Sequence, residues 1–406
     1  ANYPTMLLAA ERRSFTAAID HQLTDNLRLF GDFIYTINET RSVLNAQPVS
    51  GNVRADNVNN PFNGGLVSGV YTVGGANTIT ARNRFVNFPR IYDNKSHGLR
   101  GVVGIKGSIG DNWSYEFAGS FNRTLHNFRN LNLIDAVSYT NAVNNLTYNP
   151  FARVQARGVI EQMLGTSFRD YLSELNSFDL RVTGKVFDLP AGPVQVGFGA
   201  ETRWEHLNFD NDRYDQTGQW LQATPRQPFA ARSTTDGIFA EVRVPIFDKA
   251  NAIKGFNMLE LSVAGRKDIY SKTSDPFVPK YTIRWLPFND ELAFRGTYSE
   301  SFSAPTLYDL LGPIAQGFTA GINISRFDTS GNALNVTTGS RQYRSQSGSN
   351  PLLNPSESRN WTAGIVWSPK SVKGLEVSFD WFDVDERDLI STISSSLIVS
   401  SVEQFG

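Results

Sequence analysis

Apolar and polar residues alternate along short stretches of this chain, and residues 292–299 show the pattern most clearly. One parity holds Leu292, Phe294, Gly296 and Tyr298, and the other holds Ala293, Arg295, Thr297 and Ser299. A period of two residues predicts an extended strand with one apolar and one polar face. About ten such residues, when tilted, cross a lipid bilayer.

Twelve segments alternate in this way, and they fall into six pairs of neighbours. The predicted pairs are 13–21 with 27–38, 99–109 with 113–122, 178–187 with 194–205, 238–246 with 259–270, 281–286 with 292–302, and 361–367 with 375–384. No composition break or Pro/Ser-rich linker divides the 406 residues. We therefore predict a single repetitive all-β domain over 1–406, built from antiparallel hairpins.

The connections alternate between short and long. Five pairs turn within about three to seven residues and the fourth within about twelve, whereas most connections between pairs are long: 40–97, 123–176, 206–233 and 303–356. The connection 271–280 is the short exception. Short turns on one rim and long loops on the other are typical of outer-membrane barrels, and loops of this length are uncommon in compact soluble domains.

One long connection carries a helical pattern. Between residues 151 and 175, apolar residues recur at spacings of three and four. They are Val154, Val159, Ile160, Met163, Leu164, Phe168, Tyr171 and Leu172. We predict one amphipathic loop helix here, which packs on the other loops; a helix that binds a partner or a membrane surface is the alternative.

Composition narrows the class of protein. No apolar run reaches the ~18 residues of a membrane-spanning helix, and the mean hydropathy is negative. Zero cysteines exclude disulfides and thiolate metal sites, and a net charge of −1 gives no reason to predict a nucleic-acid partner. The first residues lack the basic start and apolar core of a signal peptide, so we expect a mature protein or a fragment.

The remaining choice is between a membrane barrel and a soluble propeller or sandwich, which alternates as well. Tryptophan and tyrosine near the ends of the apolar faces favour the barrel, because these rings prefer the membrane–water interface. They are Trp113, Tyr115, Trp204, Trp285, Tyr298, Trp361, Trp367 and Trp381. We therefore predict a transmembrane β-barrel whose apolar face meets the lipid bilayer.

Several stretches resemble the TonB-dependent outer-membrane receptors. Residues 295–305 match the pattern R-x-x-Y-S-x-x-F-x-A-P, and residues 184–205 resemble a strand–turn–strand motif of the family. Residues 350–390 resemble a third motif, in which Ser356 replaces the usual acidic residue. Asn60-Pro61-Phe62-Asn63 matches a pattern of larger members. The order of these motifs makes the resemblance specific, mostly after residue 184.

The resemblance implies a barrel of twenty-two strands, an N-terminal plug inside it and a short box that binds the inner-membrane TonB complex. With twelve strands and no plug domain in this chain, we expect a central barrel segment; a complete twelve-stranded barrel is the alternative. The resemblance also implies that lumen-facing charges contact the plug. These charges are Arg181, Glu201, Arg203, Glu241, Arg243, Arg266, Arg284 and Arg295; a ladder of mutual ion pairs around water is the alternative.

Candidate ligand-binding residues lie in the connection after the third pair. They are Tyr214, Trp220, Gln222 and Arg226, since aromatic faces stack on rings and arginine binds carboxylate or phosphate; ordinary loop packing is the alternative. Asp210, Asp212 and Asp215 do not have the spacing of an EF-hand, so we predict no metal site. Three of the four histidines are expected near the long-loop rim as solvated loop residues, with a haem or metal contact as the alternative, and no cofactor is predicted.

These observations predict transport rather than catalysis. The leading hypothesis is TonB-coupled import of a scarce solute, such as an iron chelate, cobalamin or an oligosaccharide, across the outer membrane of a Gram-negative bacterium. A passive porin and a structural or adhesive surface protein are the alternatives. No nucleophile or paired acid and base stands in a recognisable motif, so an enzyme is the least favoured class.

Overall fold

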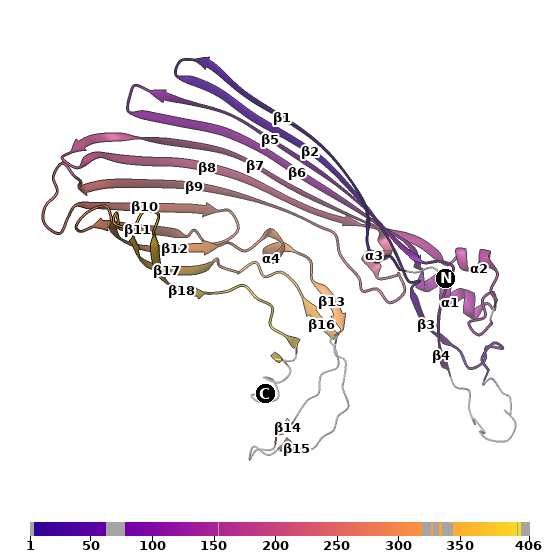
Figure 1. Ribbon diagram of the computed structural model, residues 1–406. Coiled ribbons are helices and arrows are strands. Elements are labelled where there is room, and N and C mark those ends of the chain that lie inside the picture. Colours follow the sequence, from indigo (N-terminus) through magenta and orange to yellow (C-terminus); the bar gives the residue numbers. More distant parts are fainter. Residues whose placement is uncertain are drawn as a thin grey trace.

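The computed structural model describes residues 4–61, 78–152, 154–318, 326–327, 333–334, 344–395 and 397–398. Twelve strands form one antiparallel sheet (Figure 1), and each strand is hydrogen-bonded to the strands that precede and follow it in the spatial order given next. Its strands, in spatial order, are β1 (Ala9–Thr24), β2 (Leu27–Leu44), β5 (Arg90–Ile109), β6 (Trp113–Ile134), β7 (Leu164–Leu189), β8 (Gly192–Asn211), β9 (Phe229–Phe247), β10 (Met258–Tyr270), β11 (Phe277–Leu286), β12 (Leu292–Ser303), β17 (Ser356–Trp367) and β18 (Val377–Arg387).

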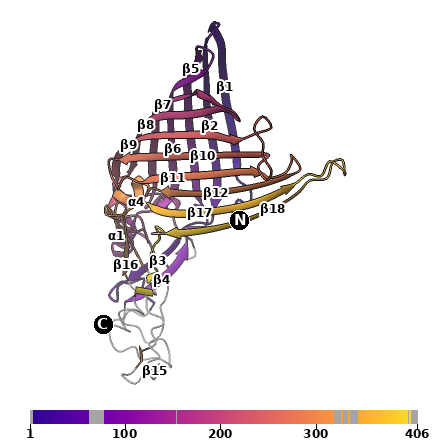
Figure 2. The ribbon, with the colours of Figure 1, turned by 90° about the vertical axis from the view of Figure 1, so that its left-hand side faces the viewer.

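All six predicted strand pairs and the all-β fold class are confirmed. The sheet curls into a trough, with β1 and β18 at its two margins (Figures 1 and 2). Among the described residues, β1 pairs only with β2 and β18 only with β17, so the sheet does not close on itself. The strands differ greatly in length: β7 has 26 residues and β11 has 10.

The convex face of the sheet is apolar and exposed. Phe178, Ile238 and Trp361 are 52%, 59% and 51% exposed. Neighbouring strands place Tyr281, Tyr298 and Trp361 side by side, with ring centroids 6.1 Å and 4.5 Å apart. Such a row of rings is typical of the aromatic girdles of membrane barrels. Tyr298 therefore lies on the outward face, as its parity predicts.

Beyond this apolar belt the long strands continue with charges on the outward parity too. Glu39 pairs with Lys95 at 2.7 Å, and Arg129 with Asp170 at 2.8 Å. The strands are therefore longer than the apolar alternation predicts, and the connections are correspondingly shorter. Three histidines fall in such extensions of β5, β6 and β8 and His21 lies in β1, so the prediction of loop histidines is wrong.

A small folded unit, which we call the platform, stands at the end of the sheet with the long connections. It comprises the hairpin β3 (Pro48–Val53) and β4 (Ile79–Arg84) with the helices α1 (Ala136–Asn144) and α2 (Arg157–Glu161). Its core contains Val49, Val53, Ala81, Phe85, Ile134, Tyr139, Val143, Tyr148, Ile160 and Met163. Asp135 caps α1 by accepting from the backbone N–H groups of Val137 and Ser138.

The remaining described elements are short. They are α3 (Arg213–Thr217), α4 (Leu307–Leu311), and the small pairs β13 (Ala315–Phe318) with β16 (Arg344–Ser347) and β14 (Arg326–Phe327) with β15 (Ala333–Leu334). No described helix is long and apolar enough to cross a membrane. Phe62 and Asn63 of the Asn-Pro-Phe-Asn motif lie outside the described residues.

The predicted loop helix over 151–175 is wrong for most of its length. Only α2 is helical there, and β7 begins at Leu164. Residues 164–175 pair with β6 on one side, and from Arg169 onward with β8 on the other. Because backbone bonds to neighbouring strands outweigh a weak local helical preference, the spacing of three and four residues did not decide the structure.

Candidate functional site

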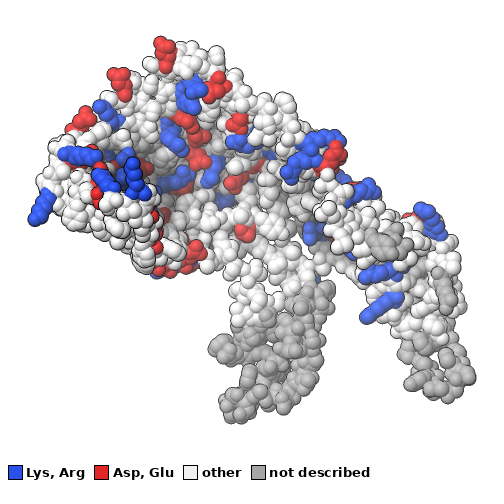
Figure 3. Space-filling view, viewed as in Figure 1, with Lys and Arg blue, Asp and Glu red and all other residues white. Residues whose placement is uncertain are grey.

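The concave face of the sheet carries the charges that the alternation assigned to one parity. Figure 3 looks onto this hollowed face and shows Lys, Arg, Asp and Glu side chains gathered inside it. The eight predicted residues share this face: Arg181 on β7, Glu201 and Arg203 on β8, Glu241 and Arg243 on β9, Arg266 on β10, Arg284 on β11 and Arg295 on β12. Their contact with a plug stays a prediction.

One ion-pair cluster spans three strands by passing over a glycine. Arg266 on β10 binds Asp268 with Nη2–Oδ1 at 2.7 Å and reaches Glu201 on β8 at 3.0 Å. Gly237 on β9 stands between Glu201 and Asp268 in the register. A Cβ at Gly237 would lie 2.6 Å from Asp268 Oδ1 and 2.7 Å from Arg266 Nη2. The missing side chain therefore makes room for the cluster.

The same arrangement recurs near the last strand. Arg295 on β12 and Asp380 on β18 are joined at 2.6 Å and 2.9 Å, although β17 lies between them. Gly364 is the residue of β17 between them in the register, and a Cβ there would lie 2.1 Å from Asp380 Oδ1. Two glycines thus let ion pairs tie together strands that are not hydrogen-bonded neighbours.

Replacing Gly237 with alanine is expected to lower the stability of the sheet. Asp268 is 1% exposed, so the added methyl group must displace a confined carboxylate, at a cost of about 1–3 kcal/mol. The measurement is thermal unfolding in detergent. Gly197→Ala is the matched control on the same face, because its Cβ would meet only Thr183 Cγ2 at 3.5 Å. Equal losses in the two variants would contradict this explanation.

Other charges of the concave face are paired locally. Arg243 binds Glu260 at 2.5 Å, Arg203 lies 3.4 Å from Glu201, and Glu241 accepts a hydrogen bond from Ser262 at 2.9 Å. Much of the face is therefore a network of mutual ion pairs. Exposed pairs of this kind each contribute little to the free energy of unfolding. The main effect of the network is therefore to fix the positions of the charges on the concave face.

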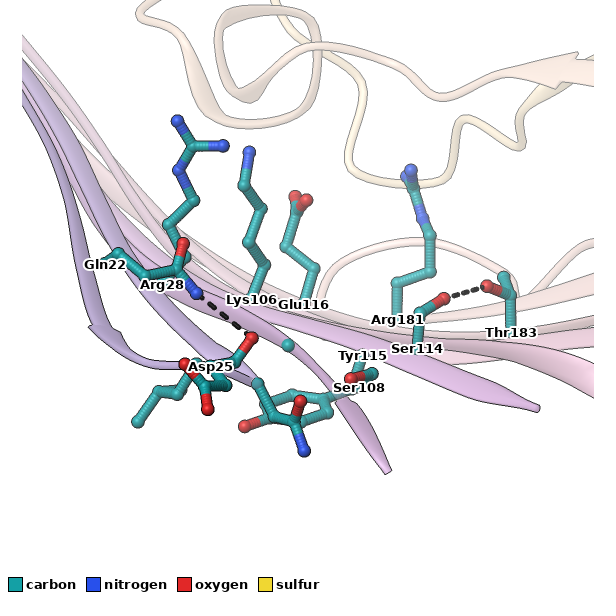
Figure 4. A pocket seen from close by; sticks show the side chains of 13 residues that line it. Gln22, Asp25, Arg28, Lys106, Ser108, Ser114, Tyr115, Glu116, Arg181 and Thr183 are labelled. Carbon is teal, nitrogen blue, oxygen red and sulfur yellow. Dashed lines mark hydrogen bonds between the residues drawn. The ribbon is translucent and has the colours of Figure 1, made fainter. Parts of the chain in front are cut away.

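Two predicted residues stay outside this network. In the part of the chain that the structure describes, Arg181 and Arg284 make no ion pair or side-chain hydrogen bond. Arg181 lies in a row with Arg28, Lys106 and Glu116 across four adjacent strands. Figure 4 shows these four side chains pointing to the same side of the strands.

This row borders a hollow of about 450 Å³ close to the short turns. Arg28 is already paired with Asp20, and the Lys106 ammonium lies 5.3 Å from the centre of the Phe30 ring. Glu116 is the only carboxylate of the row. Asp25 also lines the hollow, so three basic residues stand beside two carboxylates, and Arg181 is the basic residue of this lining for which the described residues supply no ion pair or ring contact.

The predicted ligand-binding residues lie in the connection between β8 and β9, and they differ in exposure. Trp220 is 5% exposed; its indole N–H donates to Asp212 at 3.2 Å and its ring packs 5.0 Å from that of Tyr214. Tyr214, Gln222 and Arg226 are exposed. Ligand binding by this set stays a prediction, and it concerns the three exposed members because the Trp220 ring is covered.

A buried carboxylate, which the sequence did not mark as important, fastens this connection. Asp215 is 1% exposed and accepts two bonds from Arg169, at 2.5 Å and 2.7 Å, and one from Asn211 at 3.1 Å. Burial alone would raise the pKa of Asp215, but the bonds from Arg169 and Asn211 outweigh it and lower the pKa. Asp212 caps α3 instead of joining a metal site, and no metal-binding group occurs among the described residues.

The chain is similar to one protein family and to several solved structures. The family described as "TonB dependent receptor-like, beta-barrel" matches residues 11–402, whereas no curated protein matches. The RagAB peptide transporter matches with a TM-score of 0.57 and 11% identity, over 96% of this chain and 42% of that one. The RagAB peptide importer in its open-open state gives 0.53 and 12%, over 92% and 39%.

The ferripyoverdine receptor of the outer membrane of Pseudomonas aeruginosa gives a TM-score of 0.49 and 12% identity, over 93% of this chain and 42% of that one. The chain thus spans about two fifths of the length of these solved structures. At such low identity the structural likeness shows the fold alone. Since the family match covers nearly the whole chain, the chain belongs to the TonB-dependent receptor β-barrel family.

Proposed function

We propose that the chain forms part of the barrel wall of an outer-membrane importer that takes up a scarce solute with energy coupled through TonB. The family consists of receptors and transporters of the Gram-negative outer membrane. The observation that carries the proposal is the family match over residues 11–402 on a sheet with one apolar and one charged face.

The two faces suit two different surroundings. On the convex side, a lysine or arginine at mid-bilayer would cost roughly 2–4 kcal/mol, and large apolar residues such as Phe178 and Ile238 stand there instead. On the concave side, fixed charges hold water and present polar groups to whatever fills the barrel. The long connections at the platform end are then extracellular, and the short turns are periplasmic.

Two arginines of the concave face, Arg181 beside the hollow next to the short turns and Arg284 on β11 outside it, are the candidate contacts for a plug. Arg181 and Arg284 make no ion pair with the described residues, so a carboxylate from another domain can pair with them without first breaking an ion pair. We propose that acidic side chains of the plug dock at Arg181 on β7 and at Arg284 on β11. The paired charges at Gly237 and Gly364 would stay within the wall.

The coupling is tested with the full-length receptor in cells. Uptake of the solute should disappear when the TonB box of the receptor is deleted, because the plug then cannot be displaced by the inner-membrane energy source. Uptake that persists would favour a passive porin. Uptake that is unchanged after deletion of the whole gene would favour a structural or adhesive protein.

Plug docking is tested by Arg181→Gln combined with Arg284→Gln in the full-length receptor. We expect docking to weaken by about 1 kcal/mol for each arginine, and the cells to become more sensitive to a large antibiotic such as vancomycin. Arg213→Gln is the control, because this substitution removes the same kind of charge from an exposed residue of helix α3. An unchanged sensitivity with normal amounts of receptor would contradict docking at these residues.

The solute itself is a separate question. RagAB is named a peptide transporter and the Pseudomonas aeruginosa protein a ferripyoverdine receptor, and these ligands belong to those proteins. The chemistry of this chain's own platform is the better guide to what it takes up.

A further inference from the structure

A second hollow, of about 570 Å³, lies on the platform and is lined by residues from three separate segments. Pro48 and Ser50 come from β3, Arg82 and Arg84 from β4, and Gln222 from the connection after α3. It lies at the end of the sheet with the long connections, whereas the charged row at Arg181 lies at the end with the short turns. Neither the family match nor the fold assigns it a role.

The hairpin presents two different faces, and this explains the hollow. Val49, Val53 and Ala81 lie on one face and enter the platform core. The register pairs Pro48 with Arg84 and Ser50 with Arg82, so these residues occupy the other face. Because strand side chains alternate, burying the apolar parity on α1 fixes both arginines on the open side.

The hairpin and the connection that carries Gln222 are held together by one buried glutamine. Gln47 donates from Nε2 to the carbonyl of Leu221 at 2.6 Å and accepts at Oε1 from the backbone N–H of Ile134 at 2.9 Å. Leu221 also donates its N–H to Ile134 at 2.7 Å. Gln222 follows with φ of 62°, an uncommon backbone conformation for a side-chain-bearing residue. Its place at the hollow is therefore fixed by neighbours on both sides.

Among the described residues, no carboxylate pairs with either arginine of this hollow. Arg84 donates from Nη1 to the backbone carbonyl of Ala46 at 2.7 Å, which leaves its charge uncompensated. Arg82 has no hydrogen bond or ion pair within the described ranges. By contrast Arg54, just after β3, is paired with Asp56 at 2.9 Å and does not line the hollow. In Figure 3, Lys and Arg side chains dominate the face of this part of the molecule.

We propose that this platform hollow binds the anionic part of the imported solute, a carboxylate or phosphate group on a small molecule. Guanidinium groups match both anions with paired N–H donors, and the Ser50 hydroxyl and the Gln222 amide can add hydrogen bonds. The inference rests on the proposed import function and deepens it, since it names the chemistry of the solute. It also gives Gln222, a predicted ligand residue, a role that Trp220 does not share.

Binding is tested by titration calorimetry on the purified full-length receptor in detergent, with citrate and pyrophosphate as probes. At least one probe should bind, and Arg82→Gln combined with Arg84→Gln should weaken it by about tenfold or more for each arginine. Added salt should weaken binding to the wild type as well. A preference for citrate or for pyrophosphate would distinguish a carboxylate from a phosphate ligand.

Arg54→Gln is the matched control, since it removes the same charge next to the same hairpin. It should leave binding unchanged. Absence of binding by both probes, or an equal loss in the control, would overturn the proposal. Thermal unfolding of the double arginine variant shows whether its platform still folds. If that platform does not fold, Ser50→Ala combined with Gln222→Ala serves as the second variant. This variant keeps both arginine charges and should weaken binding less.

Uptake assays separate this proposal from the import function. If TonB-dependent uptake holds but its concentration dependence is the same in the double arginine variant, the anion site is overturned and the import function stands. If uptake does not depend on TonB while the calorimetric loss is as expected, the site stands and the coupling fails.

Discussion

Replacing Asp215 with alanine should release the connection between β8 and β9 from the sheet. The substitution leaves the Arg169 guanidinium and the Asn211 amide without their shared carboxylate, and removing one partner of a buried pair costs about 3–5 kcal/mol. Asn211 also holds the carbonyl of Arg226 at 2.9 Å, so the loss should spread along the connection. Hydrogen exchange of residues 212–228 is the measurement, and it should rise strongly.

Asp210→Asn is the control for this variant, because Asp210 is exposed and its carboxylate contacts the backbone N–H of the next residue. It should exchange like the wild type. Protection of residues 212–228 that survives in Asp215→Ala would show that the Arg169 pair does not hold the connection.

Acid should have the same effect on the native chain. The pKa of Asp215 is lowered below its ordinary 3.8 in the folded protein. A group with a depressed folded pKa contributes stability above its unfolded pKa and loses it as the pH falls through the folded value. The connection should therefore stay protected at neutral pH and open only below about pH 4. In Asp215→Asn this acid step should be absent.

The second large effect is expected from Gly51→Ala, which should destabilise the platform. A Cβ at Gly51 would lie 2.2 Å from Cε1 of Tyr139, whose ring is 2% exposed. The ring cannot move without disturbing Tyr148, 5.7 Å away between centroids, so we expect a loss of about 1–3 kcal/mol. Proteolysis of the platform and its thermal unfolding provide the measurements.

Gly158→Ala is a stringent control for the packing argument. Gly158 lies in α2 with nothing within 4 Å of its Cβ position, and alanine is the better helix former. This variant should be as stable as the wild type or slightly more so. A loss as large as that of Gly51→Ala would mean that glycine replacement in the platform is harmful for reasons other than the Tyr139 contact.

The strand pairs could be predicted because the two faces of each strand have different surroundings, an apolar one outside the barrel and a watery one inside it. A residue such as Phe178 meets lipid while Asp179 faces the concave side, and this contrast produces the alternation. Above the apolar belt both faces meet water, so the signal disappears although the strands continue. The ion pair of Glu39 with Lys95 lies in such an extension, where the two faces of the strand do not differ in hydrophobicity.

The charged face could be predicted in parity but not in pairing. The alternation places Arg266 and Arg295 on one face, yet their partners Asp268 and Asp380 depend on the register of several strands. Gly237 and Gly364 gave a weak signal, because an isolated glycine inside a strand often marks a close approach. The platform could not be predicted for a different reason: its core joins residues more than one hundred positions apart, from Val49 to Met163, which no local pattern can report.

If the platform binds the solute as proposed, the unequal strand lengths would separate capture of the solute from its passage through the barrel. At about 3.3 Å per residue, the ten or so residues of β7 before Glu174 carry the chain roughly 33 Å along the strand beyond the outward ion pair of Arg123 with Glu174. A molecule held at the platform would still have this path to travel, so arrival and passage would each have their own rate. A competitor at the platform would then slow the first step and leave the second unchanged, so uptake would need more solute to reach half its maximal rate while the maximal rate stayed the same.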